Sequence, residues 1–180
     1  EAARQAYEHQ QYSVAIEKYK KGYSKIDGKK YGLKGKISYR IGESYRKNGA
    51  FRRARLYYYR AIRFEFATQK PKVYLYYAQM LQMSEDYEDA IEAYKNYLEY
   101  KPDSEIAEKG IKSCQLTQKW KDNPTGFTVD NPYRINSGED DFAPTYADKY
   151  HRSIIFTSNR EGTTGTNIDP WTGKPFSDLF

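Results

Sequence analysis

The sequence has 180 residues, of which 38% are apolar and 30% are charged. This content favours one ordinary domain or two small ones, and it disfavours both a disordered chain and a membrane-spanning one. The formal net charge of +6 raises nucleic acid as a partner. However, residues 1–72 hold 19 Lys and Arg against 6 Asp and Glu, residues 73–122 hold 6 against 10, and residues 123–180 hold 5 against 8. The whole positive excess therefore lies in the first segment.

Tyrosine supplies much of the bulk, with 20 Tyr against 8 Phe and 2 Trp, and 17 of the tyrosines fall within residues 1–100. A phenol ring buries a large surface but keeps a polar hydroxyl that needs a partner, so this composition predicts thin packed layers. The single cysteine, Cys114, excludes an internal disulfide and any cysteine-based metal cluster.

Three segments of the first 100 residues share one pattern. Residues 11–19, 50–58 and 86–94 each have an aromatic residue, an alanine three places later and a tyrosine four places after the alanine. The alanines, Ala15, Ala54 and Ala90, are 39 and 36 residues apart. These intervals are close to the period of about 34 residues that helix-turn-helix repeats have, with short insertions.

The segments upstream carry a second pattern. Ser38, Ile41, Gly42 and Tyr45 have the spacing x-x2-L-G-x2-Y, and Tyr74, Tyr77, Ala78 and Leu81 repeat it. Together these motifs resemble tetratricopeptide repeats, and Pro102 stands where that family has its helix-ending proline. The resemblance implies antiparallel helix pairs that approach closely at small residues.

The periodicity predicts seven helices, which make three pairs and a terminal cap. The glycines and lysines of residues 26–35 predict an exposed loop. The last helix has fewer aromatic residues and many charges, as a cap needs. The seven predicted helices span residues 1–10, 12–25, 35–48, 51–67, 71–84, 87–100 and 103–119.

Composition changes at residues 122–126, where helical periodicity gives way to Gly, Pro, Asn, Ser and Thr. Residues 150–158 have a strand-like pattern. Residues 139–146 followed by Phe-Thr-Ser-Asn-Arg-Glu-Gly at 156–162 resemble one blade of TolB-like β-propellers. The 44 residues from Ser137 suit one four-stranded blade of about 40–45 residues.

The two resemblances imply an α + β multidomain chain. Residues 1–121 are expected to form a tetratricopeptide-repeat α-solenoid with its capping helix, and residues 122–136 a linker. Residues 137–180 are expected to form the first, incomplete blade of an all-β propeller, because a lone blade cannot close a ring.

No catalytic constellation is found in the sequence, so we expect a protein that is not an enzyme and has no cofactor. His9 and His151 lack partners at metal-ligand spacing, and structural or solvent-facing roles are favoured for both. The acidic run Glu139–Asp141 lacks the spacing of an EF-hand, so blade-edge acids are favoured over a metal site.

The basic residues of the first segment are spread over several helix faces instead of forming one stripe. Single-strand nucleic-acid binding also needs exposed aromatic residues, which here occupy repeat core positions. Nucleic acid is therefore not expected, and an acidic protein, an anionic lipid or polymer, or plain solubility remain open.

Tetratricopeptide repeats generally bind partners on the concave surface that the first helix of each pair forms. The subfamily that grips a terminal carboxylate uses Lys and Asn one turn apart, whereas the comparable pair here is Tyr39 and Glu43. The alternative is that a partner docks on an edge or on the convex side. The residues expected in the concave groove are Arg4, Tyr7, Glu8, Tyr39, Glu43, Arg46, Lys47, Leu75, Gln79, Gln82 and Met83.

The order of the two modules along the chain indicates a narrower group of proteins than either module does by itself. A short repeat array before a TolB-like propeller resembles Bacteroidetes envelope lipoproteins that end in an OmpA-type peptidoglycan-binding domain, most closely the PorE-like components of type IX secretion systems. This resemblance implies a periplasmic, outer-membrane-associated adaptor that binds protein subunits of an envelope complex. The peptidoglycan-binding domain and the lipid anchor would lie outside these residues.

Two alternatives belong to other functional classes. One is a propeller-fronted hydrolase, which needs a downstream domain with Ser, Asp and His. The other is a glycan-binding envelope protein, for which Trp171 offers a stacking platform, although a tryptophan packed in its turn is favoured.

Overall fold

The computed structural model describes all 180 residues apart from the side chain of Gln118. The chain divides into a helical unit, Glu1–Thr125, and a β unit, Gly126–Phe180. Each unit is built from its own secondary structure.

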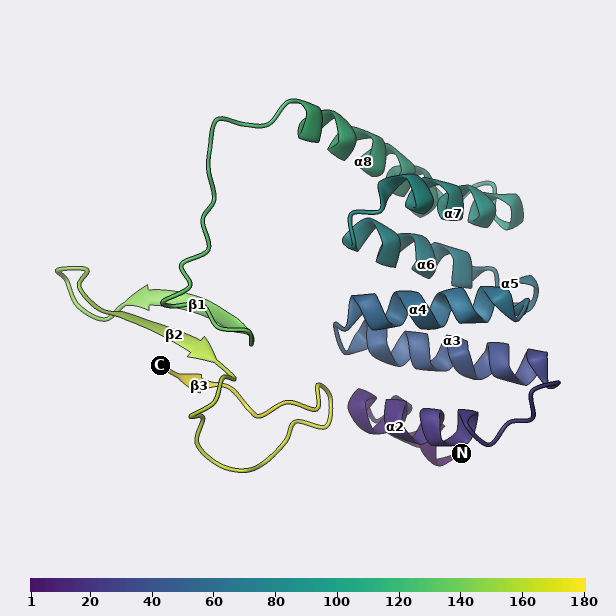
Figure 1. Cartoon of the computed structure of the whole chain (residues 1–180), viewed down its shortest axis with the longest axis horizontal. Helices are drawn as coiled ribbons and strands as arrows, with labels where there is room; N and C mark the ends of the chain where they lie inside the picture. Colours follow the sequence, from purple (N-terminus) through teal and green to yellow (C-terminus); the bar gives the residue numbers. More distant parts are fainter. The chain divides into compact units, whose positions relative to one another are not determined.

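The helical unit is a row of helices that stack side by side in sequence order (Figure 1). Three antiparallel pairs, α1 with α2, α3 with α4 and α6 with α7, are followed by α8. The elements are α1 (Ala2–Glu8), α2 (Tyr12–Tyr23), α3 (Tyr31–Lys47), α4 (Phe51–Arg63), α5 (Phe66–Gln69), α6 (Lys72–Met83), α7 (Tyr87–Tyr100) and α8 (Glu105–Asp122).

All three pairs use the same kind of turn. One residue in each turn has a left-handed backbone, with φ of 61° at Gln10, 79° at Gly49 and 64° at Glu85. Glycine adopts this conformation without the Cβ clash that a side chain incurs. The repeat that the sequence pattern predicted is therefore present in the backbone.

Small residues let the paired helices approach closely. A Cβ atom on Gly42 would lie 3.0 Å from the ring of Tyr58. Ala54, Ala78 and Ala90 are fully buried. The interior consists of two apolar clusters, one centred on α3, α4 and the start of α6, and the other on α6, α7 and α8. Buried tyrosines contribute to both clusters, with Tyr39, Tyr45 and Tyr58 in the first and Tyr94 and Tyr97 in the second.

The prediction of an exposed loop over residues 26–35 was wrong in its second half, because α3 already begins at Tyr31. Gly35 is buried in the helix, and a Cβ there would lie 2.8 Å from the Cβ of Phe66. This glycine therefore serves a close approach between α3 and the start of α5, which periodicity within one segment does not reveal.

The single helix predicted over residues 51–67 is also divided. Helix α4 ends at Arg63, and Glu65 has a left-handed φ of 57°. The turn directs Phe66 and Ala67 into the core, where both are buried. Their burial stabilises the break against the helical propensity of the local sequence.

Helix α8 begins after Ser104, whose Oγ accepts a hydrogen bond from the Ala107 backbone N–H at 3.4 Å. Its polar face agrees with a capping helix only in part. Ile106, Leu116 and Trp120 are all exposed on it. No described helix has the length and the hydropathy that crossing a membrane requires.

The β unit contains one antiparallel sheet in the order β1-β2-β3. The strands are β1 (Asp141–Tyr146), β2 (Ile154–Ser158) and β3 (Asp178–Leu179). The register between β1 and β2 shifts after Phe142, where Ala143 has a φ of 52°. The described residues thus form three strands instead of the four expected of a blade, and residues 168 and 175 add only an isolated bridge.

The carboxylate of Asp141 joins the two longer strands. Its Oδ1 accepts hydrogen bonds from the Ser158 hydroxyl and the Arg160 guanidinium, each at 2.6 Å. Its Oδ2 accepts one from the backbone N–H of Ser137. These donors hold the pKa of Asp141 well below its usual range. The Ser-Asn-Arg segment that suggested a propeller motif therefore has a structural role within this sheet.

The β unit lacks an apolar interior of its own. Among its described residues the buried ones are Ser158 and Asn159, which are both polar. Large apolar side chains are exposed on both longer strands, including Phe142, Tyr146 and Ile154. A three-stranded sheet normally needs a covered apolar face to be stable by itself.

Candidate interaction surfaces

A buried carboxylate lies at the centre of the helical unit. The Glu43 side chain of α3 accepts hydrogen bonds from the Tyr58 hydroxyl of α4 and from Arg46 Nε at 3.3 Å. Arg46 Nε also donates to the Tyr58 hydroxyl oxygen at 3.1 Å. The guanidinium carbon of Arg46 lies 4.2 Å from the ring centre of Tyr76 on α6. One network therefore connects α3, α4 and α6.

The network is largely shielded from water. Only 7% of Glu43 and none of Tyr58 is exposed. Burial and the nearby negative charge of Glu43 raise the pKa of Tyr58 far above its usual value. The same two causes raise the pKa of Tyr7 on α1 to about 12. Both hydroxyls are neutral at physiological pH, Tyr58 donates to Glu43, and Glu43 is paired with Arg46.

The next repeat has a related contact. The Tyr94 hydroxyl of α7 donates to Gln82 of α6 at 2.8 Å, and the Gln82 amide donates to Ser113 of α8 at 3.0 Å. Tyr94 and Tyr58 both stand four residues after the repeat alanine, and Gln82 and Arg46 are also equivalent. The repeat pattern thus extends to side-chain contacts. The buried tyrosine donates to the carboxylate of an ion pair in the second repeat and to the side-chain amide of Gln82 in the third.

The structure separates the residues predicted for the concave groove into two groups. Tyr39, Glu43 and Leu75 are buried and cannot contact a partner directly. Arg46 is tied to Glu43, and its side chain is 22% exposed. The members that are exposed or half-buried are Arg4, Tyr7, Glu8, Lys47, Gln79, Gln82 and Met83.

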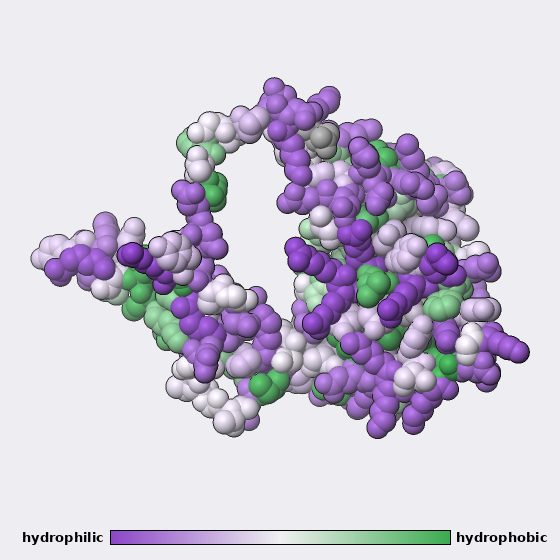
Figure 2. Space-filling view, in the orientation of Figure 1, coloured by the Kyte–Doolittle hydropathy of each residue, from purple (hydrophilic) through white to green (hydrophobic). Residues whose placement is uncertain are grey.

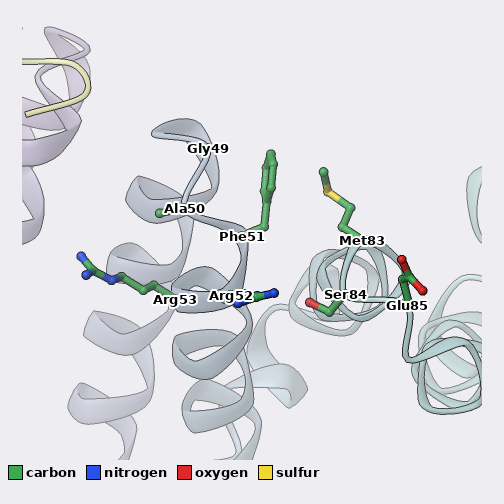
Figure 3. Close-up of a pocket in the computed structure, with 8 residues that line it drawn as sticks. All are labelled: Gly49, Ala50, Phe51, Arg52, Arg53, Met83, Ser84 and Glu85. Atoms are coloured by element: carbon green, nitrogen blue, oxygen red, sulfur yellow. The ribbon is translucent and has the colours of Figure 1, made fainter. Parts of the chain in front are cut away.

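A different hollow, which the sequence patterns did not indicate, opens beside α4 and α6 (Figure 3). It has a volume of about 560 Å³ and begins at the α3–α4 and α6–α7 turns. Figure 3 shows Phe51 and Met83 beside each other at its edge and Arg52 pointing toward Ser84. Arg52 and Ser84 also line a second hollow, of about 500 Å³.

A third hollow extends the same surface along α4 and α7. It shares Tyr59 and Tyr77 with the second hollow and has a volume of about 270 Å³. We call the three together the α4–α7 groove. Its α4 side carries Arg52, Leu56 and Tyr59, whereas its α7 side carries Asp89 and Glu92. Leu56 and Tyr59 are 47% and 43% exposed, so the groove offers apolar surface between walls of opposite charge.

An ion pair closes part of the α4–α7 groove. The Arg55 guanidinium of α4 contacts the Asp86 carboxylate at the start of α7. The rings of Tyr59 and Tyr77 lie 6.0 Å apart between their centres. A search for repeat periodicity misses this groove because its residues belong to successive repeats and meet only when the repeats stack.

The histidines, acidic residues and tryptophan that the sequence offered as candidate metal or ligand sites do not form a common site within the described structure. His9 is exposed, and the His151 ring lies 4.3 Å from the Tyr146 ring. Among the described residues, no three His, Cys, Asp or Glu side chains are grouped to hold a metal ion. The Lys174 ammonium donates a hydrogen bond to Asp140 and forms an ion pair with Glu139. Trp171 is 41% exposed, in a turn that Asp169 fixes through the Trp171 backbone N–H.

Comparison with known proteins identifies the fold of the helical unit. No protein-family model and no curated protein matches the sequence. Among solved structures, the chain is similar to the crystal structure of the Sgt2 TPR domain from Aspergillus fumigatus, with 18% identity and a TM-score of 0.51. The match covers 72% of this chain and 85% of that one. The helical unit therefore has a fold like that of tetratricopeptide repeats.

Proposed function

We propose that this chain is a non-enzymatic adaptor whose helical unit binds a partner protein. One observation carries this proposal. In the repeat array, Glu43, Arg46 and Tyr58 hydrogen-bond with one another and fix the positions of these side chains between α3 and α4. A pre-organised surface loses little conformational entropy on binding, as recognition of a partner requires.

The exposed concave residues are the proposed contacts. Lys47 lies at the end of α3, Gln79 lies on α6, and Met83, at the end of α6, is 55% exposed. A cation, an amide and a flexible thioether suit a mixed polar and apolar segment of a partner. Tyr39, Glu43 and Leu75 would act by holding these side chains in place.

We further propose that this partner is a subunit of an envelope complex and that the β unit is part of a propeller. Sheet faces with exposed Phe142, Tyr146 and Ile154 support the second point, because neighbouring blades would cover them. The first point rests on the resemblance to outer-membrane-associated periplasmic lipoproteins. Their lipid anchor would provide the membrane attachment, and their OmpA-type domain would provide the link to peptidoglycan and a secretion machine.

A pull-down of envelope proteins with the full chain tests the adaptor proposal. Lys47→Glu combined with Gln79→Ala is expected to reduce recovery of specific partners at least about tenfold. Lys112→Glu with Gln115→Ala on α8 is the matched control, since it makes the same charge change at exposed positions away from the concave set and the α4–α7 groove. Equal recovery with both variants would refute the concave assignment.

Cell fractionation tests the location. In the native organism, the protein is expected to sediment with outer membranes and to be recovered with purified peptidoglycan. Recovery in the cytosolic fraction would contradict the envelope proposal but leave the adaptor proposal standing.

A further inference from the structure

The segment of residues 1–72 carries the whole positive excess of the chain. Of its 19 Lys and Arg residues, Arg4, Arg46 and Arg55 have carboxylates within 4.0 Å among the described ion pairs. Hydrophilic side chains cover most of the visible face of the helical unit (Figure 2). The positions of these side chains show which of the cations lie close together.

Three of them are arranged on stacked tyrosine rings. Lys20 Nζ of α2 and the Arg53 guanidinium of α4 lie 5.3 and 5.8 Å from the ring centre of Tyr45 on α3. Tyr45 stacks on Tyr57 with 5.6 Å between ring centres, and the Arg60 guanidinium lies 4.9 Å from Tyr57. We call these five residues the cation–tyrosine cluster.

The rings position the cations without neutralising them. A tyrosine face attracts a cation through its quadrupole, but it carries no net charge. Within the described structure, none of the three cations has a carboxylate oxygen within 4.0 Å. Arg53 also lines the first hollow of the α4–α7 groove, and Figure 3 shows that its side chain points away from Met83 and Ser84. The result is a set of three positive charges held in place.

The third repeat shows how the same fold supplies acidic residues elsewhere. Helix α7 and its N-cap carry Asp86, Glu88 and Asp89, and Asp86 pairs with Arg55. In the alignment that places Ala15 on Ala90, the equivalent residues of the first repeat are Gln11, Ser13 and Val14. The equivalent positions of the first repeat therefore carry no acidic residue.

We propose that the cation–tyrosine cluster binds an acidic segment of a partner protein. Arg53 and Arg60 are separated by seven residues of one helix, or about 10 Å. Guanidinium groups pair bidentately with carboxylates, and Lys20 adds a point charge beside Arg53. A segment with acidic side chains about two helical turns apart would satisfy both arginines.

Other anionic ligands fit the cluster less well. Tyr45 is only 4% exposed, so its ring cannot stack on a nucleobase. The exposed large apolar side chains of the helical unit, such as Leu56 and Met83, do not belong to the cluster. Cations alone are attracted to an anionic membrane surface, but apolar side chains beside them strengthen membrane binding. This proposal rests on the proposed adaptor function in one respect, which is that the ligand is part of a protein.

Binding of the full chain to short poly-L-glutamate tests the proposal. Lys20→Ser, Arg53→Ser and Arg60→Ser together are expected to weaken binding about tenfold or more. The control Lys25→Ser, Lys29→Ser and Lys36→Ser removes the same charge from exposed positions, and it should weaken binding less than about threefold. Circular dichroism of both variants verifies the helical fold. An equal loss in both would show a non-specific charge effect and overturn the proposal.

Competing ligands decide the class of partner. Inorganic polyphosphate, phosphatidylglycerol vesicles and single-stranded DNA are compared at equal charge concentration. Tighter cluster-dependent binding of any of them than of poly-L-glutamate would overturn the choice of an acidic protein segment, as would self-association that the cluster variant abolishes. These measurements need no envelope partner. A negative result here would therefore refute the cation–tyrosine cluster proposal without affecting the pull-down test of the adaptor proposal.

Discussion

At the scale of single residues, the tyrosine hydroxyls are the distinctive feature of this fold. Tyr58 and Tyr94 are buried, and each donates its hydroxyl proton to a polar side chain on the preceding helix. The rings fill the space between helices, while the hydroxyls donate hydrogen bonds to polar side chains that the same packing buries or partly buries. Each of these tyrosines thus fills apolar core space with its ring and links two helices through its hydroxyl hydrogen bond.

Tyr58→Phe removes one such hydroxyl and leaves Glu43 with Arg46 alone. We expect the free energy of unfolding to fall by about 2 kcal/mol, because a buried hydrogen bond to a charged group is lost. Urea denaturation followed by circular dichroism measures the change. Tyr57→Phe is the control, since its half-buried ring has no hydroxyl hydrogen bond among those described, and it should change stability by less than about 0.5 kcal/mol. Equal effects would show that the hydroxyl network does not contribute.

At the scale of elements, close approach between helices depends on two kinds of small residue. The alanines and Gly42 lie in the repeat motif, and the sequence predicted their role. Gly35 lies outside the motif, in a segment predicted to be a loop, yet it contacts Phe64 and Phe66. An insertion between repeats has therefore become part of the packing.

Gly35→Ala tests this contact. The new methyl group would overlap Phe66, so we expect destabilisation of about 1–3 kcal/mol through overpacking. Gly32→Ala on the same helix meets no atom within 4 Å and should be neutral or stabilise by about 0.5 kcal/mol. Thermal unfolding of the two variants separates the outcomes. Stabilisation by both would mean that α3 and α5 do not pack as described.

At the scale of the whole molecule, the two units differ in how they are stabilised. The helical unit contains every buried apolar residue of the described chain, whereas the buried residues of the β unit are polar. Polar networks such as that of Asp141 fix the geometry of a sheet but contribute less free energy than a buried apolar interior.

Expression of the two units as separate fragments tests this difference. Residues 1–125 are expected to unfold cooperatively on heating, near the helical transition of the full chain. Residues 126–180 alone are expected to show no cooperative transition, because their sheet leaves large apolar side chains exposed. Far-UV circular dichroism measures both. A sharp thermal transition of the β fragment would show that the sheet is stable without a covering apolar surface.

The sequence by itself determined the repeat architecture of the helical unit. Helical periodicity, the repeat alanines and Gly42 are local signals, and they predicted the three helix pairs and the position of their turns. Local signals failed at the boundaries of α3 and α4, where contacts of Gly35, Phe66 and Ala67 outweigh propensity.

Only the tertiary structure shows which side chains reach the surface and which of them lie together. Helical phase placed Tyr39, Glu43 and Leu75 among the groove residues, but stacking of the next repeat buries them. Stacking also creates the α4–α7 groove and brings Lys20, Arg53 and Arg60 onto two stacked rings. The physical reason is that exposure and charge pairing depend on neighbours distant in sequence, whereas periodicity describes each helix by itself.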